Sequence, residues 1–143
     1  MAARQRRGRR LARETAMRLV YESDITQKSP NELLEERRSE FNLDEATYGY
    51  VCLLVDSISK RSTELDATIG KLTPAWPVEQ MARLDVAILR IALSEIDAGD
   101  VPAAVSISEA VELAKRYCSS LSLIHISAPT RRYAISYAVF CLK

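Results

Sequence analysis

The sequence predicts an all-α fold of about six helices, arranged as two small subdomains and followed by a tail outside the helical pattern. Apolar residues recur at helical spacing along most of the chain, and no strand-like alternation longer than a few residues precedes residue 120. The four glycines and five prolines are too few for a turn-rich β sandwich or barrel. A length of 143 residues suits one domain of ordinary size with a modest core.

Composition excludes several other classes of protein. The hydrophobic share of 48% is too high for a disordered chain, and no apolar run approaches the roughly 18 residues of a membrane span. Cys52, Cys118 and Cys141 have neither the number of a disulfide framework nor C-x-x-C spacing, and they fit a reducing cytosol. We therefore expect a cytoplasmic protein that does not enter a membrane.

The near-neutral net charge of +1 conceals a strong asymmetry along the chain. Residues 1–18 contain seven arginines and one glutamate, a net charge of about +6, so the remainder sums to about −5. No lysine precedes Lys28, and guanidinium groups bind phosphate oxygens in bidentate fashion and stack on bases better than ammonium groups do. This pattern predicts a nucleic-acid-facing end on a protein-facing body.

The first predicted helix begins at Arg9, and residues 1–8 are predicted to form a flexible arginine-rich arm, because no apolar period starts before Leu11. One apolar stripe follows the i, i+4, i+7, i+8 rule and consists of Ala12, Ala16, Leu19 and Val20. An adjoining face carries Arg6, Arg10 and Arg13 at similar spacing. We expect this helix to pack with one side and to present guanidinium groups with the next.

The next helices have start signals of their own. Ser29 can cap a second helix, since Pro30 suits the first helical position and Glu32 completes a capping box. Asp44 is the expected cap of a third helix, and Ser62 marks a break before a fourth. Their buried stripes are predicted to be Leu33 and Leu34, then Tyr48, Val51, Cys52, Val55 and Ile58, then Leu65, Ile69 and Leu72.

The segment Pro74-Ala75-Trp76-Pro77 interrupts the helical pattern, because its two prolines remove donors and disfavour helical geometry before them. It is predicted to link two subdomains, with Trp76 between them. Residues 84–96 are apolar nearly all round, which is typical of a helix at the centre of a bundle. Gly99 to Pro102 ends that helix, and Ser106 to Glu109 reads as the capping box of the last one.

The chain changes character after Tyr117. Residues 121–127 alternate poorly and contain no capped helix, and residues 138–142 are an apolar end. Such a tail would ordinarily be interpreted as an irregular strand or a closing helix. Residues 121–131 resemble a translated sequencing-library adapter with Ala128 as the one changed residue, and residues 135–142 resemble the primer end of such a library. We therefore expect an artefactual tail in which His125 and Cys141 carry no evolved function.

Catalysis is poorly supported by the sequence. The sole histidine is His125, in that tail, so a histidine-based triad or zinc site is not expected. Neither G-x-x-x-x-G-K-[ST] nor G-x-G-x-x-G occurs. We expect a protein that is not an enzyme, with no cofactor and no metal. The arginine-rich start could also be a merely solvated terminus or a mitochondrial-type presequence, although its apolar stripe continues without a break to Glu22 and Asp24.

Three blocks of sequence carry a family resemblance through their order and spacing. They are Arg9-Arg10 with Ala12-Arg13 through Ala16, Leu19 and Tyr21; Trp76 with Leu84-Asp85 and Ala87-Ile88-Leu89-Arg90; and Asp100-Val101-Pro102 with Ile107 through Tyr117. Together they resemble the bacterial antitermination factor family NusB over about residues 9–117. The resemblance implies two small helical bundles and a non-enzymatic protein. Such a protein binds the boxA element of ribosomal RNA leader transcripts with NusE, a small-subunit ribosomal protein, in the RNA polymerase antitermination complex.

The same resemblance implies functional residues. Arg9, Arg10 and Arg13 correspond to the arginine-rich RNA-binding segment of the family, Tyr21 and Asp85 correspond to the NusE-binding surface, and Glu79 falls near that surface. Arg6 and Arg7 of the arginine-rich arm are expected to bind RNA by their chemistry. By their chemistry alone, Tyr21 would be a core residue with its hydroxyl at the rim, and Asp85 would compensate a helix dipole.

Some alternatives stay open. The closing helix of the family has no counterpart after Tyr117. The N-terminal RNA-binding domain of a ribosomal RNA cytosine methyltransferase shares this fold and a similar final block, and a protein-binding helical scaffold needs the arginines only for solubility. Family members occur as monomers and as dimers, so a homodimer is also open.

Overall fold

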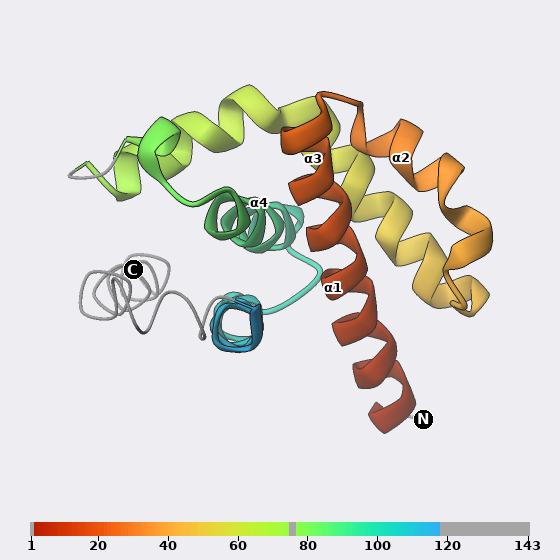
Figure 1. The fold of residues 1–143 in the computed structure, drawn as a ribbon. Helices are drawn as coiled ribbons and strands as arrows, with labels where there is room; N and C mark the ends of the chain where they lie inside the picture. Colours follow the sequence, from red (N-terminus) through yellow and green to blue (C-terminus); the bar gives the residue numbers. More distant parts are fainter. Residues whose placement is uncertain (1, 75–76, 118–143) are drawn as a thin grey trace. The chain divides into compact units, whose positions relative to one another are not determined.

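The computed structural model describes residues 2–74 and 77–117, all in helices and their connections. The chain divides into two compact units, residues 1–62 and residues 63–143. The all-α prediction is confirmed for the described residues (Figure 1). The boundary lies between Ser62 and Thr63, so the linker expected at residues 74–77 does not separate the units. Trp76 and the tail of residues 121–143 lie outside the described residues.

The first unit consists of α1 (Ala2–Thr26), α2 (Pro30–Glu36), the short 3₁₀ helix η1 (Arg38–Glu40) and the first part of α3 (Glu45–Leu72). Its core is apolar side chains from the three α helices, namely Ala12, Ala16, Met17, Leu19, Val20, Leu33, Leu34, Val51, Leu54, Val55 and Ile58. The expected apolar stripes of all three helices are therefore buried, apart from Tyr48 and Cys52, which are half-buried.

Helix α1 begins at Ala2, which corrects the expectation of a flexible arm over residues 1–8 for the described residues 2–8. Residues 2–8 are helical although they lack an apolar stripe, because contacts of Gly8 and Arg9 with α3 hold this segment in place. A Cβ atom built on Gly8 would lie 2.8 Å from the Thr47 side-chain oxygen, so α1 passes very close to α3 at this point. One residue later, the Arg9 guanidinium lies over the Tyr50 ring. Both contacts hold the basic segment against α3.

Ser29 and Asp44 cap α2 and α3 as the sequence predicts, although in the expected capping box the bond to Ser29 would come from the Glu32 N–H. The Ser29 hydroxyl accepts a hydrogen bond from the Asn31 N–H, and Pro30 occupies the first turn of α2. The Asp44 carboxylate accepts one from the Thr47 N–H at 2.7 Å. These bonds satisfy N–H groups that a helix start otherwise leaves without acceptors.

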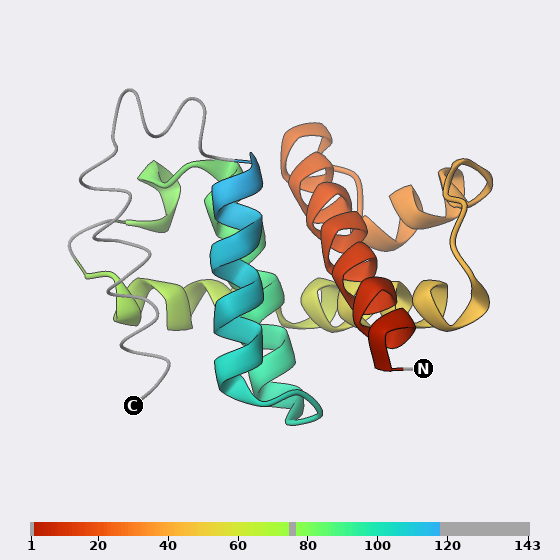
Figure 2. The ribbon, with the colours of Figure 1, turned by 90° about the horizontal axis from the view of Figure 1, so that it is seen from below.

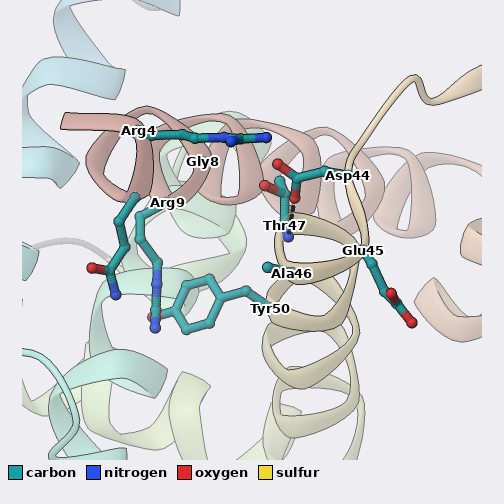
Figure 3. A pocket seen from close by; sticks show the side chains of 9 residues that line it. Arg4, Gly8, Arg9, Asp44, Glu45, Ala46, Thr47 and Tyr50 are labelled. Carbon is teal, nitrogen blue, oxygen red and sulfur yellow. Dashed lines mark hydrogen bonds between the residues drawn. The ribbon is translucent and has the colours of Figure 1, made fainter. Parts of the chain in front are cut away.

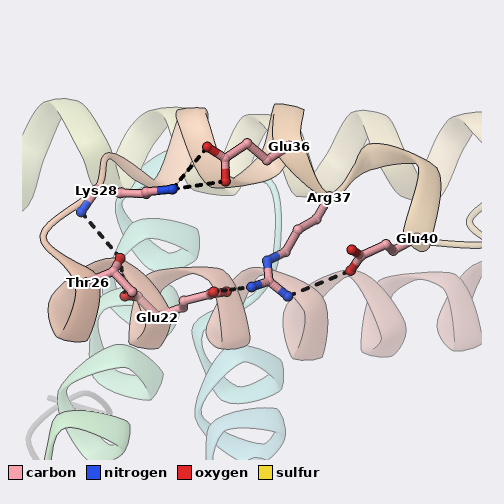
Figure 4. A network of polar contacts seen from close by, with 6 residues as sticks. All are labelled: Glu22, Thr26, Lys28, Glu36, Arg37 and Glu40. Carbon is pink, nitrogen blue, oxygen red and sulfur yellow. Dashed lines mark hydrogen bonds and ion pairs between the residues drawn. The ribbon is translucent and has the colours of Figure 1, made fainter.

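Ion pairs connect α1 with the α2–η1 segment (Figure 4). The Arg37 guanidinium lies between Glu22 of α1 and Glu40 of η1, and it donates a hydrogen bond to the Glu22 carboxylate. Lys28 pairs with Glu36 at 3.2 Å. All five side chains are partly or fully exposed to solvent, so each pair contributes only about 0–1 kcal/mol.

Helix α3 is continuous through Leu72 but contains one non-helical residue, Arg61, with φ −114° and ψ 16°. The break expected at Ser62 is therefore a kink one residue earlier, at the boundary between the two units. Leu65 and Ile69 beyond the kink are buried, as their spacing predicts, whereas Leu72 at the end of the predicted stripe is half-buried.

The second unit contains the rest of α3, the 3₁₀ helix η2 (Val78–Gln80), α4 (Arg83–Ala98) and a helix over residues 103–117. Every residue of α4 from Val86 to Glu95 is buried, which confirms the central helix expected over residues 84–96. The helix of residues 103–117 runs beside α4 (Figures 1 and 2). Gly99 closes α4 with φ 77°, a left-handed conformation that costs glycine little.

The capping box expected at Ser106 is wrong. The last described helix starts at residue 103, and the carbonyl of Pro102 accepts hydrogen bonds from the N–H groups of Val105 and Ser106. Ser106 is therefore inside the helix, with 1% of its surface exposed. Pro102, which lacks an N–H group, sets the start of this helix because it does not need the acceptor that an interior residue requires.

Across the described residues, no helix is both long enough and apolar enough to span a bilayer.

Candidate nucleic-acid interface

The arginines of α1 differ sharply in exposure. Arg6, Arg7 and Arg10 are exposed, Arg9 is half-buried, and Arg13 has only 4% of its surface exposed. Five residues that the sequence places in one RNA-binding segment therefore fall into three environments. Arg4 and Arg18, on the same helix, are exposed as well.

One outward face of α1 collects most of the exposed groups. At about 100° per residue, Arg7, Arg10, Arg18 and Tyr21 fall within an arc of about 80°. Tyr21 is 37% exposed, and Leu11 and Ile25 add exposed apolar surface on the same side. Glu14 lies within this arc and pairs with Arg18 at 3.2 Å. The structure thus brings exposed arginines and the aromatic Tyr21 together on one helix face.

Arg13 does not belong to that face. It lies on the same side of α1 as Met17 and Val20, both of which are core residues. The sequence pattern grouped it with Arg6 and Arg10 because spacing along a helix shows which residues are neighbours but not which neighbours are covered. A guanidinium that is buried this deeply is poorly placed to contact a phosphate.

Arg9 stacks on an aromatic ring from another helix. Its guanidinium carbon lies 3.7 Å from the centroid of the Tyr50 ring on α3 (Figure 3). Within the part of the chain that the structure describes, its buried Nη1 atom has no hydrogen-bond acceptor. The stack is a favourable cation–π contact. A buried donor without an acceptor costs about 1–3 kcal/mol, and more when the group is charged.

A pocket of about 800 Å³ opens beside this stack, between the start of α1 and the start of α3. Its lining is Arg4, Gln5, Gly8, Arg9, Asp44, Glu45, Ala46, Thr47 and Tyr50. A hollow of about 420 Å³ shares Arg4, Gly8, Asp44 and Thr47 with it and extends to Arg7 and Leu11. The basic half of α1 therefore borders a concave surface.

Asp44 is the acidic group at the rim of the pocket that faces Arg4, whose side chain extends along α1 toward it (Figure 3). Hydrogen bonds from the backbone and side chain of Thr47 lower the pKa of Asp44 below its ordinary value of 3.8, and the nearby Arg4 charge lowers this pKa further. Asp44 is therefore an anion at neutral pH, so the pocket combines cationic and anionic groups.

The sequence alone does not indicate Tyr50 and Asp44 as residues of this surface. It indicates Asp44 only as a helix cap, and it gives Tyr50 no role. No local pattern could have found them, because Arg9 and Tyr50 are 41 positions apart and meet only when α1 packs on α3.

The other predicted partner residues are in the second unit. Asp85 is half-buried in the first turn of α4, and Glu79 is exposed in η2. Tyr21 is in the first unit. Asp85 occupies the position where an acidic side chain compensates a helix dipole. The described residues contain no cluster of three or more histidine, cysteine, aspartate or glutamate side chains that could hold a metal ion.

Comparison with known families decides the relationship of this chain to other proteins. The sequence model of the NusB family matches residues 10–122. The chain belongs to the NusB family. The transcription antitermination protein NusB of Acetivibrio thermocellus is 38% identical over 111 residues, which cover 77% of this chain and 77% of that protein. The NusB protein of Roseiflexus sp. is 39% identical over 117 residues, or 80% of this chain and 82% of its own.

Solved structures agree with the NusB fold. The solution structure of NusB from Aquifex aeolicus superposes with a TM-score of 0.72 over 94% of this chain and 88% of its own, at 24% identity. A chain in the crystal structure of a plectonemic RNA supercoil superposes with a TM-score of 0.77 over 94% of both chains, at 23% identity. At these identities the likeness establishes the fold. The curated members of the family that this chain matches are named as transcription antitermination proteins.

Proposed function

We propose that this NusB-family chain binds the boxA element of ribosomal RNA leader transcripts together with NusE, and so joins the RNA polymerase antitermination complex in the cytoplasm. The observation that carries the proposal is the exposed arginine face of α1 in a chain of this family. Single-stranded RNA is bound largely through its phosphates and its unstacked bases. Guanidinium groups suit both kinds of contact.

We assign each arginine of α1 a role in RNA binding according to how exposed its side chain is. Arg6, Arg7 and Arg10 are the direct phosphate contacts, because their side chains are exposed on consecutive turns of one rigid helix. Arg9 contributes after leaving its place over Tyr50. Arg13 supports the helix from within the core and does not touch the RNA.

NusE binding uses Tyr21, Asp85 and Glu79 in this proposal. Tyr21 supports it best, since a 37% exposed aromatic ring one helical turn from exposed Ile25 is the kind of surface that protein partners cover. Asp85 and Glu79 supply negative charge, which suits a basic ribosomal protein. Because Tyr21 shares its helix face with Arg7 and Arg10, the partner and the RNA would lie next to each other along α1.

The test measures how RNA affinity depends on salt. Each phosphate contact on a single strand contributes about −0.7 to the slope of log K against log salt concentration. The double variant Arg7→Ala with Arg10→Ala should therefore flatten the slope for a boxA RNA by about 1.4. Arg83→Ala is the matched control, because Arg83 is an exposed arginine at the start of α4 in the second unit. It should leave the slope unchanged.

Two results would count against the proposal. If the unaltered chain showed no salt-dependent binding of boxA RNA, with or without NusE, RNA binding would be excluded. If Arg83→Ala flattened the slope by about half as much as the double variant, that is, equally per arginine removed, the effect would come from net charge and not from this helix face. Light scattering on the same samples reports whether the chain is a monomer or a homodimer.

The methyltransferase alternative is less well supported. The matched segment covers 77% of the Acetivibrio thermocellus protein and 82% of the Roseiflexus protein, so neither has room for an added catalytic domain. These relatives are named as antitermination proteins.

A further inference from the structure

In the Arg9–Tyr50 stack the aromatic ring is covered, but one nitrogen of the guanidinium lacks a hydrogen-bond acceptor in the described part of the chain. The ring of Tyr50 is covered by a planar cation at 3.7 Å, yet the buried Arg9 Nη1 atom has no acceptor among the described residues. A charged donor in that position gains when it reaches an acceptor elsewhere. Opening of the stack is therefore favoured when a phosphate oxygen comes within reach of the Arg9 side chain, because the Nη1 atom then gains an acceptor.

Opening the stack would expose a flat aromatic face at the edge of a pocket. The pocket measures about 800 Å³, within the range of about 300–1,000 Å³ that is typical of small-molecule sites. Proteins that bind single-stranded RNA use aromatic rings of this kind as stacking platforms for bases. A nucleobase is planar, as the guanidinium is, and would replace it over the ring.

The charges of the pocket favour a base over a phosphate group. Asp44 is anionic and lines the same pocket, so it would repel a phosphate placed inside. A base carries no charge and offers both donors and acceptors. Arg4 and Gln5 can donate hydrogen bonds to it, and Asp44 can accept them. The phosphates would remain outside, at the exposed Arg6, Arg7 and Arg10.

We propose that Tyr50 is a base-stacking residue for single-stranded RNA and that Arg9 occupies its ring only in the free protein. On binding, Arg9 moves to a phosphate and an unpaired base takes its place over Tyr50. This inference rests on the proposed function, since it requires RNA to lie along α1. It adds a contact on α3 that no pattern in the sequence indicates.

The first test compares two substitutions of Tyr50. Tyr50→Leu removes the platform and should weaken binding of single-stranded boxA RNA about 5- to 150-fold, the range expected for losing one base–aromatic stack. Tyr50→Phe keeps the ring and should bind within about twofold of the unaltered chain. Circular dichroism and thermal unfolding of each variant show whether the half-buried position 50 tolerates the change.

The second test uses the unaltered chain and therefore does not depend on a variant that folds. RNAs that carry one 5-iodouridine at successive uridine positions are irradiated in complex with the protein, and the cross-linked peptide is identified by mass spectrometry. At least one position should cross-link to Tyr50. Cross-links that form only elsewhere, or equal affinities of folded Tyr50→Leu and Tyr50→Phe, would overturn the inference. Both results leave the salt-dependent binding by Arg7 and Arg10 intact and thus differ from a failure of the proposed function.

Discussion

Gly8 is the residue on which the helical course of the basic segment depends. A side chain at this position would enter the space of the Thr47 side-chain oxygen, which is 2.8 Å from the ideal Cβ position. Thr47 is β-branched and buried, so it has little freedom to move away. The close approach of α1 to α3 is therefore possible because residue 8 has no Cβ.

We predict that two glycine-to-alanine substitutions change the free energy of unfolding in opposite directions. Gly8→Ala should destabilise the protein by about 1 kcal/mol, because overpacking costs about 1–3 kcal/mol and the better helix propensity returns at most about 1 kcal/mol. Gly49→Ala is the matched control on α3, since a Cβ there meets nothing within 4 Å. It should stabilise by about 0.5–1 kcal/mol. Urea unfolding measures both, and equal stabilisation would show that α1 does not approach α3 so closely.

The arginines of α1 also show that one residue type can have different environments on one helix. Arg13 is buried among core residues, Arg9 lies over Tyr50, and Arg10 between them is exposed. These differences follow from the rotation of about 100° per residue, which turns consecutive arginines toward different surroundings.

At the scale of elements, an ion pair joins the second part of α3 to α4. The Arg90 guanidinium donates two hydrogen bonds of 2.8 Å to the Asp66 carboxylate, through Nε and through Nη2. The Arg90 side chain is 11% exposed and that of Asp66 is 33% exposed. A bidentate pair of this kind is both strong and directional, so it sets how the two helices pack.

Asp66→Asn should destabilise the protein by about 1–3 kcal/mol. The change keeps the shape of the side chain but removes the negative charge that Asp66 places against the Arg90 guanidinium. The cost is below the roughly 3–5 kcal/mol of a fully buried pair because Asp66 is a third exposed. Asp56→Asn is a control in the same helix, where Asp56 pairs with Lys60 in solvent and should cost under about 0.5 kcal/mol. Thermal unfolding compares them, and similar costs would contradict the structural role of the Arg90 pair.

At the scale of the whole molecule, the residues proposed to bind RNA and NusE are divided between the two compact units. The arginine face and Tyr21 are in residues 1–62, and Glu79 and Asp85 are in residues 63–143. RNA affinity of the isolated protein should therefore depend on one unit, while NusE binding depends on both.

Asp85→Lys tests this division. It should weaken NusE binding measured by calorimetry and leave RNA binding by the isolated chain unchanged, because the arginines proposed to contact RNA are all in residues 1–62. Asp85 is in the first turn of α4 and half-buried, so Asp85→Asn controls for the loss of dipole compensation. If Asp85→Lys lowered both affinities equally and Asp85→Asn did so as well, partial unfolding would be the explanation.

The sequence by itself determined the features that depend on residues close together in the chain. The caps at Ser29 and Asp44, the buried stripes of α1 and α3 and the central position of α4 are set within one or two helical turns, where spacing and side-chain chemistry suffice. The family was also visible in blocks of adjacent residues, and the match over residues 10–122 confirms it.

Only the tertiary structure decided which of those residues are available and what they touch. The helical start at Ala2, the burial of Arg13, the boundary after Ser62 and the stack of Arg9 on Tyr50 all depend on contacts between distant segments. Helical periodicity shows that residues share a face but not which element covers it, because coverage depends on the packing of other helices. The candidate RNA surface is therefore a local pattern of arginines that long-range packing has divided into exposed, stacked and buried groups.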